Sequence, residues 1–334
     1  MVRSDIRLAL PSKGRLEPES LAFLDACGLG IYKPNPRQYQ ATIPAVPGLS
    51  VLFQRPGDIV VGVRQGSLDF GITGLDVVEE KRVNGEIVVL HEALGFGQCS
   101  LALAVPETWE AVQRVADLIA RQAQQPDPLR VATKFPRLTR SFLTQHGLAA
   151  VRLIESEGTL EVAPTIGYAD LIADLVSTGT TLRDNRLRPL PDGVILESQA
   201  VLIANRAALQ TRSDVLHVAR LLLEYIEAHV RAQGSYLVFV NMRGESPEAI
   251  AQRMDEQPHL GGLQGPTISR VLTRDGLPWY DVNIVVRKDR LMETIAELRA
   301  IGGSGVVVTP VTYIFEEEPP RYMRLLRELE AAAQ

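Results

Sequence analysis

The chain has 334 residues, and because domains usually hold roughly 100–200 residues, two or three domains are expected. Hydrophobic residues make up 46% and charged residues 22% of it, which suits packed cores and excludes a largely disordered chain. The 35 basic and 40 acidic residues give a net charge of −5, so no electrostatic case exists for nucleic acid or an anionic membrane as main partner. Basic residues can still cluster locally, so the net charge does not exclude a small anionic substrate.

Targeting signals and fixed metal sites are not expected. The first apolar run, residues 8–11, is too short for a signal peptide, and the sequence has no run of about 18 apolar residues. Cys27 and Cys99 allow one disulfide at most, and we expect reduced thiols in a cytoplasmic protein. The 5 histidines are scattered without a paired spacing, so a metal held by protein ligands alone is not predicted.

Short apolar runs alternate with amphipathic segments in the first half of the chain, which predicts an α/β fold. Pro18 and Gly28 bracket the first helix, at the positions where helices favour these residues. Strands are expected at 6–10, 51–54, 68–73, 100–105 and 130–133; helices are expected at 17–27, at 59–65, from residue 74, and between 105 and 130.

The pattern changes after a long amphipathic helix predicted at 209–230. Strand, helix, strand, strand, helix and strand then follow in the order typical of a ferredoxin-like domain; they are expected at 236–241, 247–255, 268–272, 280–286, 290–300 and 305–311. A charged amphipathic helix is predicted at 319–333, where we expect it to pack on a neighbouring lobe or subunit.

Two segments share a weak internal similarity. Gly66 and Asp69 have the same spacing as Gly167 and Asp170, and in both segments an apolar strand and a Thr-Gly turn follow. The distance from Asp to Thr-Gly differs, so chance is one explanation. The other is a pair of similar α/β lobes, each presenting a strand-to-helix turn.

The strongest local signal is an apolar strand that runs into a turn of small hydroxylated residues. The turn consists of Ser177, Thr178, Gly179, Thr180 and Thr181. Backbone N–H groups, hydroxyls and a helix N-terminus together favour a phosphate group. Asp170 and Asp174 are four residues apart and so share one face of a strand, where they suit ribose hydroxyls or Mg²⁺. The alternative is a simple helix cap.

Other polar groups follow the carboxyl ends of predicted strands, where α/β sheets place ligands. Lys13 and Arg15 flank a glycine and suit polyphosphate, although solvated surface charge is the alternative. Glu161 is either a first-turn helix acid or a site carboxylate. Further turns carry Arg55 and the run Thr73, Gly74, Leu75, Asp76.

The sequence resembles the long form of ATP phosphoribosyltransferase, the first enzyme of histidine biosynthesis. The residues that carry the resemblance are LPSKGRL (10–16), RPGDI (55–59), GSLDFGITGLDVVEE (66–80), RVATKFPRLTRSF (130–142), GTLEVAPTIGYADLIADLVSTGTTLRDN (158–185), ILESQAVLIANR (195–206) and PTIS (266–269). The resemblance spans about residues 5 to 315, and the block at 158–185 is its most specific part.

The resemblance implies two lobes like those of type II periplasmic binding proteins, followed by a ferredoxin-like, ACT-like regulatory domain. Lobe I would comprise residues 1–98 and 191–230, and lobe II, inserted into it, residues 99–190. The regulatory domain would span 235–316 and a terminal helix 317–334. A homo-oligomer, as dimer or hexamer, is also implied.

The implied reaction joins N1 of ATP to C1 of phosphoribosyl pyrophosphate and releases pyrophosphate with Mg²⁺ assistance. By the same resemblance, Ser177–Thr181 would hold the 5-phosphate, and Asp170 and Asp174 the ribose hydroxyls, with Mg²⁺ nearby. The catalytic residues would be Glu161, Lys13 and Arg15. The ATP site would include Lys13, Arg15, Arg55, Thr73, Gly74, Leu75 and Asp76.

The regulatory domain implied by the resemblance would bind histidine as a feedback inhibitor through Pro266, Thr267 and Ser269. The family's usual serine before Pro-Thr is Gly265 here, which removes one hydroxyl contact. Two other kinds of protein remain as alternatives: a non-catalytic two-lobed small-molecule binder and a regulatory partner subunit. A solute binder needs neither the phosphate turn nor the Lys13 and Arg15 cations, and a regulatory subunit could lose that turn.

Overall fold

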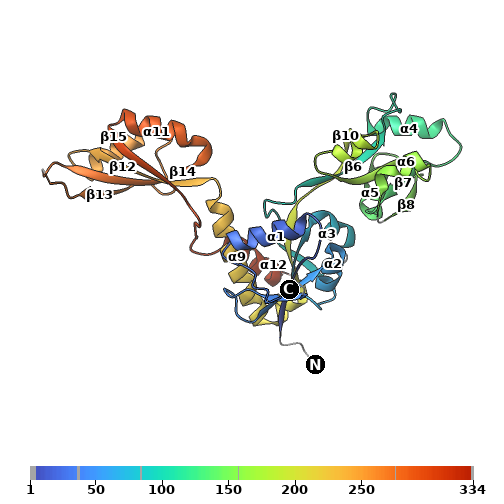
Figure 1. Cartoon of the computed structure of the whole chain (residues 1–334), viewed down its shortest axis with the longest axis horizontal. Helices are drawn as coiled ribbons and strands as arrows, with labels where there is room; N and C mark the ends of the chain where they lie inside the picture. Colours follow the sequence, from blue (N-terminus) through green and yellow to red (C-terminus); the bar gives the residue numbers. More distant parts are fainter. Residues whose placement is uncertain (1–4, 36–37, 83–84, 157, 275, 332–334) are drawn as a thin grey trace. The chain divides into compact units, whose positions relative to one another are not determined.

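The computed structural model describes residues 5–35, 38–82, 85–156, 158–274 and 276–331. The chain divides into two compact units (Figure 1). The first comprises Met1–Leu223 with Pro319–Gln334, and the second comprises Glu224–Glu318. The first unit holds two separate sheets and the second holds one.

Lobe I is built on a six-stranded sheet of order β2-β3-β1-β4-β11-β5. Strand β1 pairs in parallel with β3 and β4, while β11 lies antiparallel between β4 and β5. The strands are β1 (Ile6–Pro11), β2 (Gln40–Thr42), β3 (Leu49–Gln54), β4 (Phe70–Gly74), β5 (Ile87–His91) and β11 (Ala200–Asn205). The helices are α1 (Leu16–Ala26), α2 (Pro56–Arg64), α3 (Leu75–Lys81) and α8 (Arg206–Thr211).

Lobe II is built on a five-stranded sheet of order β10-β6-β9-β7-β8. Strand β7 pairs in parallel with β8 and β9, and β6 is antiparallel to β9 and β10. The strands are β6 (Cys99–Pro106), β7 (Arg130–Thr133), β8 (Arg152–Glu155), β9 (Leu171–Val176) and β10 (Leu187–Ser198). The helical segments are α4 (Val115–Ala123), α5 (Pro136–Gln145), α6 (Ala163–Ile166), α7 (Thr180–Asp184) and a 3₁₀ turn, Leu160–Val162.

This topology confirms the two-lobed fold, and the strands of lobe II lie between β5 and β11 of lobe I in the sequence. The chain leaves the first sheet after β5 and returns to it in β11. The return differs from the predicted boundary at residue 190, because β10 stays paired with β6 up to Ser198. The crossing back into lobe I therefore falls at Gln199, where the partly exposed strand β10 gives way to the fully buried strand β11.

The second unit confirms the ferredoxin-like order. Its four-stranded antiparallel sheet has the order β13-β14-β12-β15, and helix α11 lies along this sheet in Figure 1. The elements are β12 (Ser235–Arg243), α10 (Pro247–Asp255), β13 (Thr267–Val271), β14 (Trp279–Arg287), a 3₁₀ turn (Lys288–Arg290), α11 (Leu291–Ala300) and β15 (Gly303–Pro310). Buried residues of β12 and β14 alternate with more exposed ones, as expected when one face of a sheet packs on a core.

The predicted continuous helix at 209–230 is wrong at its start. Arg212 adopts an extended conformation with φ −124° and ψ 105°, so α8 ends there and α9 (Ser213–Ala232) begins anew. The guanidinium of Arg212 pairs with the buried Asp69 and with Asp214. An ion pair leaves no trace in the spacing of hydrophobic residues, so that spacing predicts one continuous helix across the break.

The C-terminal helix α12 (Pro320–Ala331) packs on lobe I beside β5. Leu325 and Leu329 are buried, and Arg321 and Arg324 donate hydrogen bonds to the carboxylate of Glu92. Of the two expectations for the terminal helix, packing on a lobe of its own chain is therefore confirmed. Residues 332–334 of the predicted segment lie outside the described residues. In the part of the chain that the structure describes, no helix is both long and apolar enough to cross a membrane.

Candidate active site

The hydroxyl-rich turn lies directly after β9 and opens helix α7. Gly179 has φ +71°, a left-handed conformation that glycine adopts without steric cost. The Oγ1 atoms of Thr178 and Thr180 lie 3.1 Å apart, and Arg183 donates to Thr180 Oγ1 at 3.2 Å. Ser177, Thr178, Thr180 and Thr181 are exposed, so their hydroxyls are open to a ligand. Because α7 has only 5 residues, the hydroxyls and nearby cations contribute more than its dipole.

Arg15 joins the two lobes at this turn. Its guanidinium donates to Ser177 Oγ and to the Gln98 carbonyl, each at 2.9 Å. Lys13 and Arg15 are both exposed in the loop after β1, and the intervening Gly14 has φ +76°. The structure thus brings the cationic loop of lobe I to the hydroxyl turn of lobe II.

Arg55 and the turn at Gly74 lie at the same edge of the lobe I sheet as Lys13. Strands β1, β3 and β4 are parallel neighbours, so their carboxyl ends face one way. Arg55 is exposed where α2 begins after β3. Basic groups therefore follow two of these three strands, as the sequence predicts.

Two carboxylates of lobe II, Asp174 and Glu161, are coupled electrostatically. Burial raises the pKa of Asp174 to about 6; the Leu175 N–H lowers it, the charge of Glu161 raises it and that of Lys134 lowers it. Glu161 lies on the 3₁₀ turn after Thr159, whose φ is +50°. The charge of Glu161 therefore acts on Asp174 across lobe II.

Asp170 lies at the opposite end of β9 from the hydroxyl turn. Strand β9 begins at Leu171, and Arg130 at the start of β7 donates to Asp170 through its backbone N–H at 2.7 Å and its guanidinium at 2.8 Å. Burial alone would raise the pKa of Asp170, but the Arg130 hydrogen bonds outweigh it and the pKa is lowered. The structure does not bring Asp170 together with Asp174 and the turn.

The Thr73–Asp76 turn of lobe I points into the protein. Thr73 and Asp76 are buried, and Ser198 Oγ donates to Asp76 Oδ1 at 2.6 Å. A side chain on Gly74 would collide with the Asp76 carboxylate. Burial raises the pKa of Asp76, the Ser198 hydrogen bond and local backbone N–H groups lower it, and Lys134 lowers it further. This turn anchors the crossing strand β10, and Leu75 is the member that lines a pocket.

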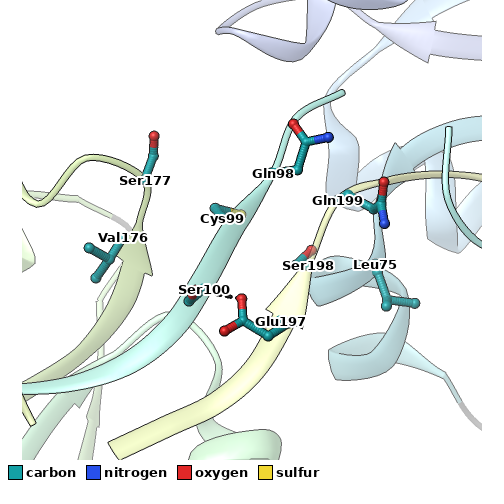
Figure 2. Close-up of a pocket in the computed structure, with 9 residues that line it drawn as sticks. All are labelled: Leu75, Gln98, Cys99, Ser100, Val176, Ser177, Glu197, Ser198 and Gln199. Carbon is teal, nitrogen blue, oxygen red and sulfur yellow. Dashed lines mark hydrogen bonds between the residues drawn. The ribbon is translucent and has the colours of Figure 1, made fainter. Parts of the chain in front are cut away.

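A pocket of about 300 Å³ lies where the chain crosses between the lobes. Both crossing segments, 98–100 and 197–199, line it, together with Leu75 of lobe I and Val176 and Ser177 of lobe II (Figure 2). Ser100 Oγ donates to Glu197 at 2.6 Å and ties the two crossings together. Burial is the main cause that raises the pKa of the Cys99 thiol in this pocket. Ser177 belongs both to the pocket and to the hydroxyl turn.

Sequence reasoning did not select Lys134 as a site residue. Thr133 pairs with Ala173 in the parallel β7–β9 ladder, so Lys134 and Asp174 are the next residues of neighbouring strands. Lys134 is exposed and contributes to the electrostatics of both Asp174 and Asp76. A signal was present, because Lys134 follows its strand directly, much as Lys13 follows β1.

The carboxylates fit Mg²⁺ that is shared with a substrate. Mg²⁺ prefers oxygen ligands and is usually held by one or two carboxylates together with substrate phosphates. Asp174 and Glu161 offer two such carboxylates. Burial is the main cause of the raised pKa of Asp174 and the charge of Glu161 adds to it, so a cation bound there would favour the ionised carboxylate. Among the described residues no group of three or more His, Cys, Asp or Glu forms a self-sufficient metal site.

The predicted regulatory residues lie on the edge strand of the second unit. Thr267 and Ser269 are exposed on β13, and Pro266 precedes it. Their register partners on β14 are Asn283 and Asp281, so these four polar side chains share one face of the sheet.

The fold is that of a two-lobed α/β protein in which a cation of lobe I, Arg15, bonds to the hydroxyl turn of lobe II. Residues 55–227 match the family described as ATP phosphoribosyltransferase (HisG), and residues 232–313 match its C-terminal domain. ATP phosphoribosyltransferase 2, chloroplastic, of Arabidopsis thaliana is 48% identical over 98% of this chain and 81% of its own length. ATP phosphoribosyltransferase of Nitrobacter hamburgensis is 35% identical over 95% of this chain and 96% of its own.

A solved structure gives the same result. The ATP phosphoribosyltransferase (HisG:HisZ) complex of Thermotoga maritima matches with a TM-score of 0.52 and 26% identity, over 66% of this chain and 98% of its own. The chain belongs to the ATP phosphoribosyltransferase family, and it is a transferase. The resemblance inferred from the sequence motifs is confirmed.

Proposed function

We propose that this chain joins N1 of ATP to C1 of phosphoribosyl pyrophosphate and releases pyrophosphate, the first step of histidine biosynthesis. The observation that carries this proposal is the exposed hydroxyl turn at 177–181, with Arg15 bonded to Ser177 and Asp174 on the strand that leads into it. A phosphorylated ribose needs phosphate donors and a carboxylate for its hydroxyls, and this turn offers both.

The roles of the residues follow from their positions. The hydroxyls and N–H groups at 177–181 hold the 5-phosphate, and Asp174 accepts from the ribose hydroxyls. Lys13, Arg15 and Arg55 face the polyphosphates at the edge of the lobe I sheet. Leu75, in the pocket at the crossings, contacts the nucleotide, and the buried Asp76 supports it indirectly. Asp170 has no direct role in this site.

The chemistry needs no strong general base. The C1–oxygen bond to pyrophosphate breaks and the C1–N1 bond forms, while the cations Lys13, Arg15 and Arg55 neutralise the leaving pyrophosphate. Mg²⁺, when bound, would supply further positive charge to the phosphates. The ribosyl carbon gains positive charge in the transition state, and the Glu161 carboxylate near Asp174 stabilises it. Mg²⁺ would be held by Asp174 and Glu161 together with substrate phosphates.

Replacing one hydroxyl of the turn tests the assignment. Thr178→Val keeps the size of the side chain and removes a phosphate donor, so we expect the KM for phosphoribosyl pyrophosphate to rise roughly 10- to 100-fold, the range for a lost hydrogen bond to a charged group. The measurement is pyrophosphate release with both substrates and Mg²⁺. Thr144→Val, at an exposed position of α5, is the matched control. Wild-type KM in Thr178→Val would show that the turn does not bind the sugar phosphate.

We also propose feedback control by histidine at the face that carries Pro266, Thr267 and Ser269. The Asn283 Oδ1 atom, in register with Thr267, is buried and has no hydrogen-bond partner within the described residues. With Asp281 beside it, this face suits a ligand ammonium group. Repeating the two-substrate assay with and without histidine tests this separately from catalysis.

Two further parts of the proposal concern the setting of the enzyme. A homo-oligomer, as dimer or hexamer, is proposed from the family resemblance, and a cytoplasmic location from Cys27 and Cys99, both free thiols. The alternative of a non-catalytic binder is disfavoured by the open turn and the Lys13 and Arg15 cations. If the pure protein released no pyrophosphate with both substrates under any condition, the non-catalytic binder would be the favoured function.

A further inference from the structure

Helix α5 of lobe II begins without a local cap. Phe135 stands at its N-cap position and Pro136 follows at the first helical position. The Phe135 side chain cannot accept a hydrogen bond. The N–H groups of Arg137 and Leu138 are among those that a helix leaves unpaired. Their partner must come from elsewhere in the molecule.

That partner is Glu80 of lobe I, near the end of α3. Its carboxylate accepts from the Arg137 N–H at 2.9 Å and from the Leu138 N–H at 3.0 Å. In return, Arg137 Nε donates to the Glu80 carbonyl at 3.0 Å. The negative C-terminal end of α3 therefore meets the positive N-terminal end of α5, an arrangement in which both helix dipoles are stabilised.

The loop before α5 is held rigidly to this helix. Thr133 and Thr139 are fully buried, their Oγ1 atoms lie 3.2 Å apart, and the Phe135 N–H donates to Thr133 Oγ1 at 3.0 Å. Lys134 stands between these bonded residues. Because Lys134 is held to the start of α5, the contact of Glu80 with the first turn of α5 also fixes the position of Lys134 relative to lobe I.

Lys134 is the exposed cation beside Asp174, as the β7–β9 register requires. It also acts electrostatically on Asp76 of lobe I. The contact between Glu80 and α5 therefore sets the lobe arrangement that brings a lobe II cation to carboxylates of both lobes. Arg15, bonded to Ser177, makes a second connection between the lobes.

We propose that Glu80 is a positioning residue for the transfer, a latch that holds the lobes where Lys134 and the hydroxyl turn face the lobe I loops together. The proposal rests on the proposed function. Glu80 contacts the first turn of α5 and acts through the lobe arrangement, without touching the reacting atoms.

The test combines kinetics with hydrogen exchange in the full-length protein. In Glu80→Ala we expect kcat/KM for phosphoribosyl pyrophosphate to fall roughly tenfold, the factor expected when a helix cap is lost. The amides of Arg137 and Leu138 should exchange roughly tenfold faster, because their acceptor is gone. Glu80→Gln, which keeps one oxygen acceptor, should recover part of both losses.

Glu79→Gln is the matched control. Glu79 neighbours Glu80 in α3 but pairs with Arg82 of its own lobe, so both readouts should stay at wild-type values. Unchanged exchange in Glu80→Ala would mean that the latch does not form in solution. Faster exchange with unchanged kcat/KM would mean that it forms but positions nothing. A wild-type protein that releases no pyrophosphate would refute the proposed function, while the exchange result would still report on the latch.

Discussion

Strand β4 of lobe I and strand β9 of lobe II begin with the same hydrogen-bonded aspartate and end differently. In lobe I, Asp69 precedes β4 and accepts from the Arg7 N–H at 2.8 Å, while its own N–H donates to the Arg7 carbonyl. In lobe II, Asp170 precedes β9 and exchanges the same two hydrogen bonds with Arg130, the first at 2.7 Å. The weak similarity between the two sequence segments is thus a real structural correspondence.

The difference lies at the other end of each strand. At the carboxyl end of β4, Thr73 and Asp76 are buried, and Asp76 binds Ser198 of the crossing segment. After β9, the hydroxyls at 177–181 are exposed. One turn therefore stabilises the connection between the lobes, and the other is open to a ligand. The comparison also shows that the aspartate before each strand holds two strand starts together.

The largest expected effect concerns Asp69, the more buried of the two aspartates. Its side chain is 1% exposed and pairs with Arg212 at 3.0 Å. Asp69→Ala leaves that arginine without its buried partner, so we expect a loss of about 3–5 kcal/mol in the free energy of unfolding. Chemical denaturation of the full-length protein measures it. Asp5→Ala, which removes an exposed pair with Arg7, should cost less than about 1 kcal/mol; an equal loss in both would contradict the argument.

The next effect is a pH dependence of stability that arises in lobe I. His91 is fully buried on β5, and its Nε2 has no hydrogen-bond partner within the described residues. Its pKa is lowered to about 4, mainly by burial and also by the charges of Arg321 and Arg324, while the charge of Glu92 opposes this shift. The ordinary pKa of histidine is about 6.5. Between about pH 6.5 and 4, His91 is protonated in the unfolded chain and neutral in the folded chain, so the free energy of unfolding falls as the pH is lowered.

That loss should reach about 3 kcal/mol, since each pKa unit is worth about 1.4 kcal/mol. Denaturation curves at several pH values measure it. The variant His91→Gln should flatten the pH dependence in this window. His146→Gln, at an exposed position in lobe II, should leave it unchanged. A wild-type protein with constant stability from pH 7 to 4 would show that His91 is not held neutral.

The sequence predicted the edges of the sheets better than the contacts between the lobes. A strand followed by Gly and hydroxyl or basic residues is a local pattern, so Lys13, Arg15 and 177–181 could be selected from it. Glu80 could not, because its partners are backbone N–H groups 57 and 58 residues away. Asp170 was grouped with Asp174 because residues four apart share a strand face. Spacing gives the face and not the end of the strand, and β9 begins only after Asp170.

The smallest expected effect is at Asp170, and it tests the comparison most directly. If Asp170 corresponds to Asp69, then Asp170→Asn keeps an acceptor for the Arg130 N–H and should leave the KM for phosphoribosyl pyrophosphate within about twofold of wild type. Because Asp170 is 24% exposed and Arg130 is 37% exposed, solvent screens the pair and the stability loss should be about 1 kcal/mol. Steady-state kinetics beside the Thr178→Val variant decide the point. A KM raised as far as in Thr178→Val would mean that Asp170 contacts the sugar. Asp170 and Asp69 would then share their backbone position and differ in their role.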